Sequence, residues 1–296
     1  MMKLSVITVT FNAERTLERT LKSVREQTCP DLEHLIVDGA STDGTVELIR
    51  NSGNLPVSEG KVSLLNFAER RQIAQSERWK GGKVERRLGG GETRGLGDGE
   101  TRRLGDSGKV LKWVSEPDRG LYDAMNKAIR MATGDYLCFL NAGDTFFSLD
   151  TVEKMMQTFD PENPPDILYG ETAIVDEEGA FLHMRRLKAP GTLSWKSFKQ
   201  GMVVCHQAFI VKRELAEPYD LSYRFSSDFD WCIRMMKKTA SIHNTRLTLV
   251  NYLNEGMTTA NRKASLKERY RIMAKYYGHT STVLHHIWFV IRAMLK

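Results

Sequence analysis

Short polar stretches rich in Asp and Asn follow four apolar segments of this chain. They are TFNAE (residues 10–14), DGASTDG (38–44), EPDRGLYD (116–123) and NAGD (141–144). Carboxylate and amide groups of this kind can accept hydrogen bonds from a nucleotide base and ribose, and they can hold a divalent cation on phosphates. The sequence contains neither GxGxxG nor GxxxxGK[ST], which excludes a dinucleotide fingerprint and a P-loop.

The segments that precede these stretches have the pattern of a parallel sheet. Apolar strands are expected over 4–11, 34–38, 110–116 and 135–141, and a helical pattern follows each of them. This α/β alternation predicts a mostly parallel, Rossmann-like sheet with crossover helices on its faces. Ligands of such sheets bind beyond the carboxyl ends of the strands, which is where all four polar stretches fall.

Composition and cysteine use are typical of a globular protein. Of the 296 residues 41% are hydrophobic and 27% charged, so the chain as a whole is neither disordered nor membrane-spanning. The four cysteines form no CxxC pair, which argues against zinc and fits a reducing compartment. The first residues lack a signal-peptide pattern, and no apolar window of about 18 residues occurs. We therefore expect a cytoplasmic protein.

Residues 51–109 differ from the rest and predict a low-complexity insertion. They hold 12 of the 23 glycines and carry 12 Lys and Arg against 8 Asp and Glu, a net charge of +4. An eight-residue period over 87–110 offers too little apolar surface to offset chain entropy, so we interpret 87–109 as a flexible loop. A short amphipathic helix is expected over 61–79. Because acidic residues are interleaved with the arginines, a nucleic-acid-binding arm is disfavoured.

The C-terminal residues 261–296 predict basic amphipathic helices. From residue 262 onward eight Lys and Arg stand against one acidic residue, Glu268, and the apolar run VLHHIWFVIRAML occupies 283–295. That run is too short to span a membrane. Basic residues beside Trp, Phe and Ile favour contact with an anionic membrane surface, and a helix packed on the rest of the protein is the alternative.

Four stretches stand together in a characteristic order. They are SVITVTFNAERTLERTLKSV (5–24), LIVDGASTDGT (35–45), SEPDRGLYDAMNKAI (115–129) and ATGDYLCFLNAGD (132–144). Together they resemble inverting glycosyltransferases of family 2, which have the GT-A fold, and the third is most similar to bacterial members that build surface polysaccharides. The resemblance implies a catalytic domain made of residues 1–50 and 110–260.

The resemblance also implies a site for a nucleotide-sugar donor. Asp38 would accept a hydrogen bond from the base, the TVTFN turn would line the same pocket, and Asp118 and its neighbours would face ribose and pyrophosphate. Asx turns and helix caps are the alternative for Asp38 and Asp43, and a core histidine is an equal alternative for His206. The residues assigned to the donor are Thr8, Thr10, Asn12, Asp38, Ser41, Asp43, Asp118, Asp123, Asn126, Asn141 and His206.

NAGD occupies the place of the family's DxD metal motif and departs from it. Asn141 stands where the first Asp is usual, Gly143 stands where the second is usual, and Asp144 follows. The resemblance therefore implies Mg²⁺ or Mn²⁺ with Asp144 as its carboxylate ligand, and a weaker metal dependence than an intact DxD would give. Capping of the following helix is the alternative for Asp144.

The stretch SSDFDWCIRM (226–235) resembles the family's acceptor-side ED motif at a helix start, with Ser227 in place of Glu. An attacking hydroxyl must lose its proton, which requires a carboxylate within hydrogen-bond reach. The resemblance implies that Asp228 is this general base. Asp230 competes for the role, and helix capping is the alternative for Asp228.

The sequence thus predicts an inverting transferase of a hexose or N-acetylhexosamine. The donor would be a nucleoside-diphosphate sugar, with UDP expected, and the acceptor would be a glycan or a lipid-linked molecule. The protein itself would be cytoplasmic or peripheral on the inner face of the plasma membrane. A catalytically inactive nucleotide-sugar-binding scaffold stays open because the DxD is not intact. A sugar-nucleotide nucleotidyltransferase is disfavoured, since no Gly-rich phosphate loop bearing Arg or Lys follows the first strand.

Overall fold

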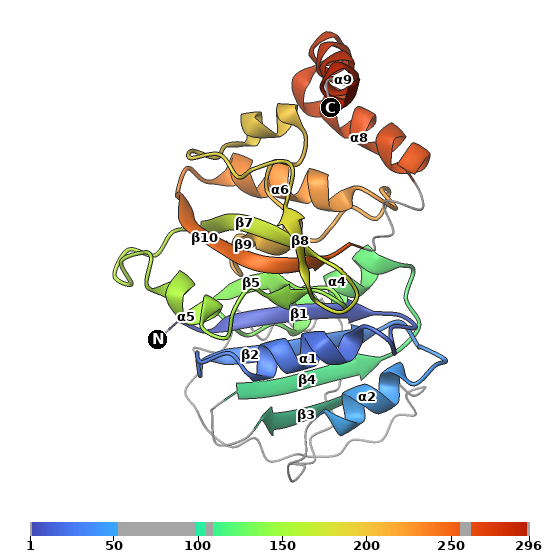
Figure 1. Ribbon diagram of the computed structural model, residues 1–296, viewed down its shortest axis with the longest axis vertical. Helices are drawn as coiled ribbons and strands as arrows, with labels where there is room; N and C mark the ends of the chain where they lie inside the picture. Colours follow the sequence, from blue (N-terminus) through green and yellow to red (C-terminus); the bar gives the residue numbers. More distant parts are fainter. Residues whose placement is uncertain (1, 53–98, 105–108, 255–261, 295–296) are drawn as a thin grey trace, which may run out of the picture.

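Within the described residues a ten-stranded mixed sheet carries the rest of the structure (Figure 1). The computed structural model describes residues 2–52, 99–104, 109–254 and 262–294. The strand order is β3-β4-β2-β1-β5-β9-β7-β10-β6, and β8 pairs with β7.

The strands and helices have the following bounds. The strands are β1 (Leu4–Thr10), β2 (Leu32–Asp38), β3 (Gly99–Leu104), β4 (Lys109–Ser115), β5 (Tyr136–Phe139), β6 (Thr145–Phe146), β7 (Ile167–Val175), β8 (Phe181–Met184), β9 (Phe209–Lys212) and β10 (Ile242–Leu253). The helices are α1 (Leu17–Arg25), α2 (Thr45–Asn51), α4 (Leu121–Met131), α5 (Thr151–Met156), α6 (Ser227–Lys238), α8 (Arg262–Tyr277) and α9 (His279–Met294), with the 3₁₀ helices η2 (Trp195–Gln200) and η3 (His206–Ala208).

Six strands of the sheet run in one direction. β1 is parallel to β2 and β5, and β2 is parallel to β4. β9 is antiparallel to both β5 and β7, so β7 runs with β5, and β10 is parallel to β7. The carboxyl ends of these six strands therefore meet at one edge of the sheet, on the right in Figure 1. The predicted mostly parallel sheet with crossover helices is confirmed.

Both faces of the central strands β1 and β2 are covered, which explains why their apolar side chains pack on both sides of the sheet. Every residue of β1 and β2 is buried. On one face Leu35 and Val37 join a core that includes residues of α4 and α6, and on the other Ile36 packs with residues of α1 and α2. Near-continuous apolar runs are typical of parallel strands covered on two sides.

Strand β3 lies inside the segment that was expected to be a loop. Gly99–Leu104 pairs antiparallel with β4, so the loop prediction for 87–109 is wrong over these residues. A strand at the edge of a sheet is held by backbone hydrogen bonds, which need little apolar side-chain surface. The loop prediction rests on the small apolar surface of the eight-residue repeat and therefore overlooks such a strand. Lys109 begins β4 and is buried, with its ammonium donating to the carbonyl oxygen of Arg25 at 2.8 Å. The helix expected over 61–79 lies outside the described residues.

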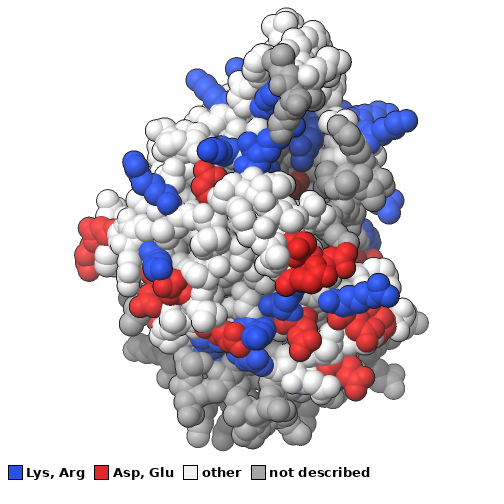
Figure 2. Space-filling model, in the orientation of Figure 1, with Lys and Arg blue, Asp and Glu red and all other residues white. Residues whose placement is uncertain are grey.

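The C-terminal helices stand at one end of the molecule's long axis, at the top of Figure 1. α8 and α9 form a hairpin that meets the domain through α6 and η2. Figure 2 shows Lys and Arg side chains gathered around this end of the visible face, whereas most Asp and Glu side chains lie further down. Among the described residues no helix is long and apolar enough to cross a membrane.

Candidate active site

The loops after β1 and β2 interlock to form one wall of the carboxyl-end edge. The backbone N–H of Asn12 donates to Ser41 Oγ at 2.8 Å, and the N–H of Thr42 donates to Asn12 Oδ1 at 2.9 Å. Asn12 and Ala40 have positive φ angles of 49° and 61°, a conformation that asparagine tolerates better than alanine. These cross-loop bonds hold the strained backbone in place, so Asn12 and Ser41 shape the wall.

Asp38 ties the end of β2 to the end of β4. Its carboxylate is buried and accepts three hydrogen bonds, from Ser41 N–H at 2.9 Å, Ser41 Oγ at 2.5 Å and Ser115 Oγ at 2.6 Å. The residue is fully buried, so a ligand has no access to this carboxylate. Its first role in this fold is to align two strand ends.

Asp43 is exposed and organises the start of α2. It accepts hydrogen bonds from Thr45 Oγ1 at 2.5 Å, Thr45 N–H at 3.0 Å and Glu14 N–H at 3.2 Å. These bonds, the one from the Thr45 hydroxyl above all, lower the pKa of Asp43. These contacts are those of an Asx turn at a helix start, the alternative role that the sequence left open for Asp43.

Asp118 and Asp123 lie at the start of α4, beside the wall. Asp118 Oδ1 accepts the N–H of Gly120 at 2.7 Å, and Asp123 Oδ2 accepts the N–H of Arg119 at 3.1 Å. A Cβ atom at Gly39 would lie only 2.6 Å from Asp118 Oδ2, so glycine is required for this approach. Both carboxylates remain partly exposed at the edge.

Phe11 belongs to the TVTFN turn that was expected to line the base pocket, but it was not singled out as a donor residue. Its side chain is 64% exposed, and Cδ2 lies 3.4 Å from the position of a Cβ at Gly39. The sequence pattern assigned Phe11 to the end of an apolar strand. The structure ends β1 at Thr10 and leaves the ring in solvent beside the Asp38 loop. An exposed aromatic ring in such a place can stack on a planar base.

The NAGD turn is fastened to β10 and α1. Asp144 is buried, and both of its carboxylate oxygens are in use. Oδ1 accepts the N–H of Leu253 at 3.0 Å, and Oδ2 accepts Gln207 Nε2 at 2.9 Å. Burial raises the pKa of Asp144 to about 7 against the opposing effect of these two hydrogen bonds. Gly143 has a φ of 98°, and a Cβ there would lie 2.7 Å from Leu253 Cδ2.

The burial of Asp144 does not fit its assignment as a metal ligand. A ligand for Mg²⁺ or Mn²⁺ must present a carboxylate oxygen to the ion, and Asp144 is buried with each oxygen turned to a protein donor. An Asp in place of Gly143 would need a left-handed backbone and would collide with Leu253. Among the described residues no group of three or more His, Cys, Asp or Glu could hold a metal ion. Asn141 Oδ1 is buried without a hydrogen-bond partner and is the NAGD oxygen left for a ligand.

Three residues expected at the donor are buried and have protein partners. Thr8 Oγ1 donates to the carbonyl oxygen of Leu140 at 2.7 Å. Asn126 Nδ2 donates to the carbonyl oxygen of Tyr219, and Asn126 Oδ1 accepts the N–H of Tyr219. His206 Nε2 lies 2.7 Å from the Tyr219 hydroxyl, and burial lowers the pKa of His206 to about 4. This corrects the expectation that they face the donor: their geometry is that of core residues. Thr10 Oγ1 is buried without a partner.

Asp228 lies at the first turn of α6 and faces the start of α4. The Tyr122 hydroxyl donates to Asp228 Oδ1 at 3.0 Å, and the carboxylate is partly exposed. Burial raises the pKa of Tyr122 well above its usual value, so the phenol stays a donor. The Tyr122 ring stacks on Tyr219, which stacks on Trp231 of α6, at centroid distances of 5.4 and 5.0 Å. This stack holds the two helices in register.

Asp230 is the competing carboxylate, and it is closed off from solvent. It is fully buried and accepts Arg234 Nε at 2.7 Å, Lys275 Nζ at 3.0 Å and the Tyr276 hydroxyl at 2.8 Å. An acceptor hydroxyl cannot reach a carboxylate in this position. Of the two, Asp228 is the one that is partly exposed and can act as a general base. Tyr122, which sequence reasoning did not select, is the residue that joins Asp228 to the donor edge.

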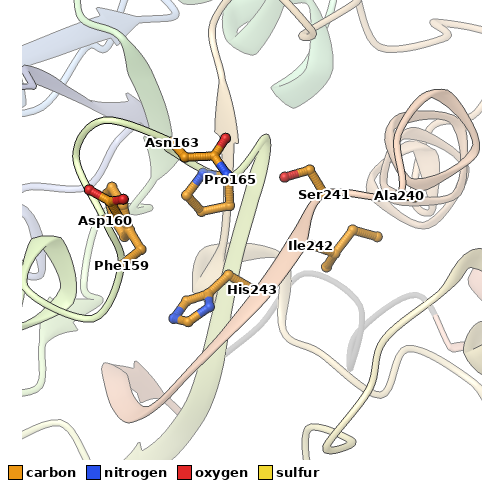
Figure 3. Close-up of a pocket in the computed structure, with 8 residues that line it drawn as sticks. All are labelled: Phe159, Asp160, Asn163, Pro165, Ala240, Ser241, Ile242 and His243. Atoms are coloured by element: carbon orange, nitrogen blue, oxygen red, sulfur yellow. The ribbon is translucent and has the colours of Figure 1, made fainter.

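A separate cavity of about 410 Å³ lies at the opposite edge of the sheet (Figure 3). It is lined by residues just before β7, among them Phe159 and Pro165, and by Ser241 to His243 at the start of β10. Both strands begin here, so this is the amino-end edge. None of the predicted site residues lies in it.

The comparison with protein families now gives the class of protein. Residues 5–76 and 103–219, more than half of the chain, match the profile described as glycosyl transferase family 2. The chain belongs to this family, and the protein is a glycosyltransferase. The stretch between the two matched parts, 77–102, lies within the expected insertion.

Curated bacterial relatives match most of the chain. A PGL/p-HBAD biosynthesis glycosyltransferase of Mycobacterium bovis is 27% identical over 258 residues, which cover 85% of this chain and 76% of the relative. The amylovoran biosynthesis glycosyltransferase AmsB of Erwinia amylovora is 24% identical over 261 residues, 84% of this chain and 68% of AmsB.

Solved structures share the fold at low identity. TarS of S. aureus in complex with UDP-GlcNAc matches with a TM-score of 0.58 at 16% identity over 92% of this chain, which spans 64% of that TarS chain. The mannosyltransferase PcManGT of Pyrobaculum calidifontis, in complex with GDP-Man and Mn²⁺, matches with a TM-score of 0.53 at 16% identity, over 96% of this chain and 74% of PcManGT. The predicted GT-A fold is confirmed by these neighbours.

Replacing Asp144 by asparagine tests its buried carboxylate. A carboxyl group with a raised pKa holds its proton in the folded state, so folding stability falls as the pH rises from about 4 through 7. Asp144→Asn removes this loss. The free energy of unfolding of the variant, minus that of the wild type, should therefore increase as the pH rises over that range. Urea unfolding at pH 4.5, 6 and 7.5 measures the difference, and the neutral core histidines are common to both proteins. A difference in the free energy of unfolding that stays constant with pH would contradict a raised pKa of the buried Asp144 carboxyl group.

Proposed function

We propose that this glycosyltransferase moves a hexose or N-acetylhexosamine from a UDP-sugar to a glycan or lipid-linked acceptor, with inversion, in the biosynthesis of bacterial surface glycans or glycolipids. The names of the mycobacterial relative and of AmsB support the biosynthetic role. TarS, a neighbour in fold, was solved with UDP-GlcNAc, which supports the donor class. Four cysteines that are free and buried support a cytoplasmic location.

One observation carries the proposal: the Tyr122–Asp228 hydrogen bond of 3.0 Å brings a free carboxylate to the edge that carries the donor residues. Tyr122 lies between Asp118 and Asp123 in the sequence, at the start of α4. A base there can reach an acceptor hydroxyl beside a donor that is bound over the carboxyl ends of β1, β2 and β4.

The reaction then needs a single displacement. Asp228 accepts the proton of the acceptor hydroxyl while the hydroxyl oxygen forms a bond to the anomeric carbon. The bond from that carbon to the diphosphate oxygen breaks on the opposite face, and the nucleoside diphosphate leaves with both bonding electrons. The anomeric configuration inverts, and no covalent enzyme intermediate is required.

We assign the donor's base and ribose to the wall formed by Phe11, Asn12, Ser41 and the start of α4. Phe11 offers a stacking surface, and the partly exposed carboxylates of Asp118 and Asp123 offer acceptors to base and ribose. PcManGT was solved with Mn²⁺, but the buried carboxylate of Asp144 does not fit a resident metal. The second candidate, a donor-binding scaffold without turnover, is favoured by Gly143 in place of the second Asp of DxD.

Asp228→Asn separates chemistry from binding. We expect turnover to fall by about 10²–10⁴-fold, the usual contribution of a general base, while the affinity for the UDP-sugar stays within about twofold. The measurements are product formation by mass spectrometry after a donor screen, and calorimetric titration of the donor with and without Mn²⁺. Wild-type protein that binds a donor but transfers no sugar to any acceptor would favour the scaffold.

Asp230→Asn is the matched control for this variant. Asp230→Asn should lower the free energy of unfolding, because Arg234 and Lys275 lose the negative charge of the buried carboxylate that they both bind. The donor affinity of the folded fraction should not change. Normal turnover in Asp228→Asn would remove the base from the proposal.

Tyr122→Phe keeps the aromatic stack and removes the hydrogen bond to Asp228. The hydrogen bond holds the carboxylate at the donor edge, so its loss should lower kcat. The KM for the donor should stay the same. An unchanged kcat would mean that the hydroxyl does not position the base.

Phe11→Ala tests the stacking surface. Base–aromatic stacking contributes about 1–3 kcal/mol per base, so the donor affinity should fall about 5- to 150-fold. Phe147→Ala, at a phenylalanine that is 47% exposed beyond β6, is the control and should bind the donor normally. Equal affinities of the two variants would exclude Phe11 from the donor site.

A further inference from the structure

The outward face of α9 carries a continuous apolar stripe. Its most exposed members include Leu284, which is 62% exposed, and Met294, which is 78% exposed. The intervals between these residues repeat on one side of a helix. The stripe is formed by Leu284, Ile287, Trp288, Val290, Ile291 and Met294. Contiguous apolar surface of this kind marks an interaction site on a protein.

The other face of α9 already packs on the rest of the protein, so the stripe is not the face by which α9 joins the domain. Thr282 is buried, and Phe289 packs against the main core near Gly201. Arg186 Nη2 donates to the carbonyl oxygen of Arg292 at 3.0 Å. The hairpin is thereby fixed to the domain with its apolar stripe turned outward.

The surroundings of the stripe are basic. Residues 262–294 contain seven Lys and Arg and one acidic residue, Glu268. The carboxylate of Glu268 accepts the backbone N–H groups of Arg224 and Phe225, at 2.9 and 2.8 Å. Exposed cations on α8 and on the neighbouring segment include Lys267, Arg271 and Arg186, and Figure 2 shows the concentration of blue around this end.

We propose that the α9 stripe and the cations around it form a docking surface for an anionic lipid bilayer. Apolar side chains would enter the boundary between head groups and acyl chains, and the lysines and arginines would lie against anionic head groups. A second copy of the chain fits less well, because pairing two stripes would bring the same cations together.

The docking surface is mechanically joined to the candidate base. α8 holds the residues on both sides of Asp228: Ser265 Oγ lies 3.1 Å from Ser226 Oγ, and Lys275 binds Asp230 at 3.0 Å. A docked hairpin would thus hold the start of α6 at a set distance from the membrane. If the proposed function holds, this placement selects lipid-linked acceptors, whose reacting hydroxyl lies close to the head groups.

Vesicle flotation with the full chain tests the docking surface directly. We expect binding to vesicles of phosphatidylcholine with a third phosphatidylglycerol, at least about tenfold weaker binding to pure phosphatidylcholine, and loss of binding as salt screens the charges. Equal binding to both vesicle types, or binding to neither, would overturn the proposal.

The double variant Leu284→Glu, Ile287→Glu should lose at least about tenfold in binding to the anionic vesicles, since it places charges in the stripe. Leu149→Glu is the matched control: this leucine is 57% exposed, lies beside α5, and its variant should bind as the wild type does. Equal binding of the two variants would overturn the proposal. So would a dimer, seen by sedimentation without lipid, that the double variant abolishes.

Donor titration of the same proteins keeps the two proposals distinguishable. The double variant should bind the UDP-sugar as the wild type does, because α9 carries none of the donor residues. Loss of vesicle binding with normal donor binding would leave the proposed function intact, and absence of donor binding in every protein would count against the proposed function alone.

Discussion

The hydrogen bond between Tyr122 and Asp228 joins the two halves of the site. α4 begins at the edge where the parallel strands end, and α6 begins 106 residues further along the chain. The Tyr122–Tyr219–Trp231 stack keeps the two helix starts together, and Asn126 fixes the backbone of Tyr219 from the side of α4. Without these contacts nothing described here would hold Asp228 of α6 beside the donor edge at the start of α4.

A second constraint sorts the aspartates of the site. A carboxylate can bind a ligand or take a proton only where a ligand can reach it. Asp38, Asp144 and Asp230 are buried and hydrogen-bonded within the protein, so they fasten the ends of β2 and β4, the NAGD turn and α6. Asp228 has one protein donor and is partly exposed. The chemistry therefore concentrates at Asp228.

The same reasoning explains the departure from DxD. The turn after β5 needs a left-handed residue at Gly143 and leaves no room for a side chain beside Leu253. Its fourth residue, Asp144, closes the turn on the end of β10. The turn is thus built for structural closure, with Asn141 Oδ1 left as a neutral acceptor. This division of labour is compatible with donor binding through hydrogen bonds.

The sequence by itself determined the parallel strands β1, β2, β4 and β5 with their crossover helices, the family and the edge at which the polar loops gather. These follow from periodicity along short segments and from the order of motifs, which are local properties of the chain. It did not predict β3 or the strands β6 to β10. β3 is an edge strand held by backbone pairing that leaves no side-chain pattern, and β7, β9 and β10 pair with strands that are distant in the chain.

Only the tertiary structure decided which polar residues are free. Asp144 meets a backbone N–H 109 residues away, His206 is enclosed by the aromatic core, and Phe11 is left in solvent at the end of β1. Burial and the filling of hydrogen-bond acceptors depend on partners that are distant in the chain, and no pattern within a single motif records them.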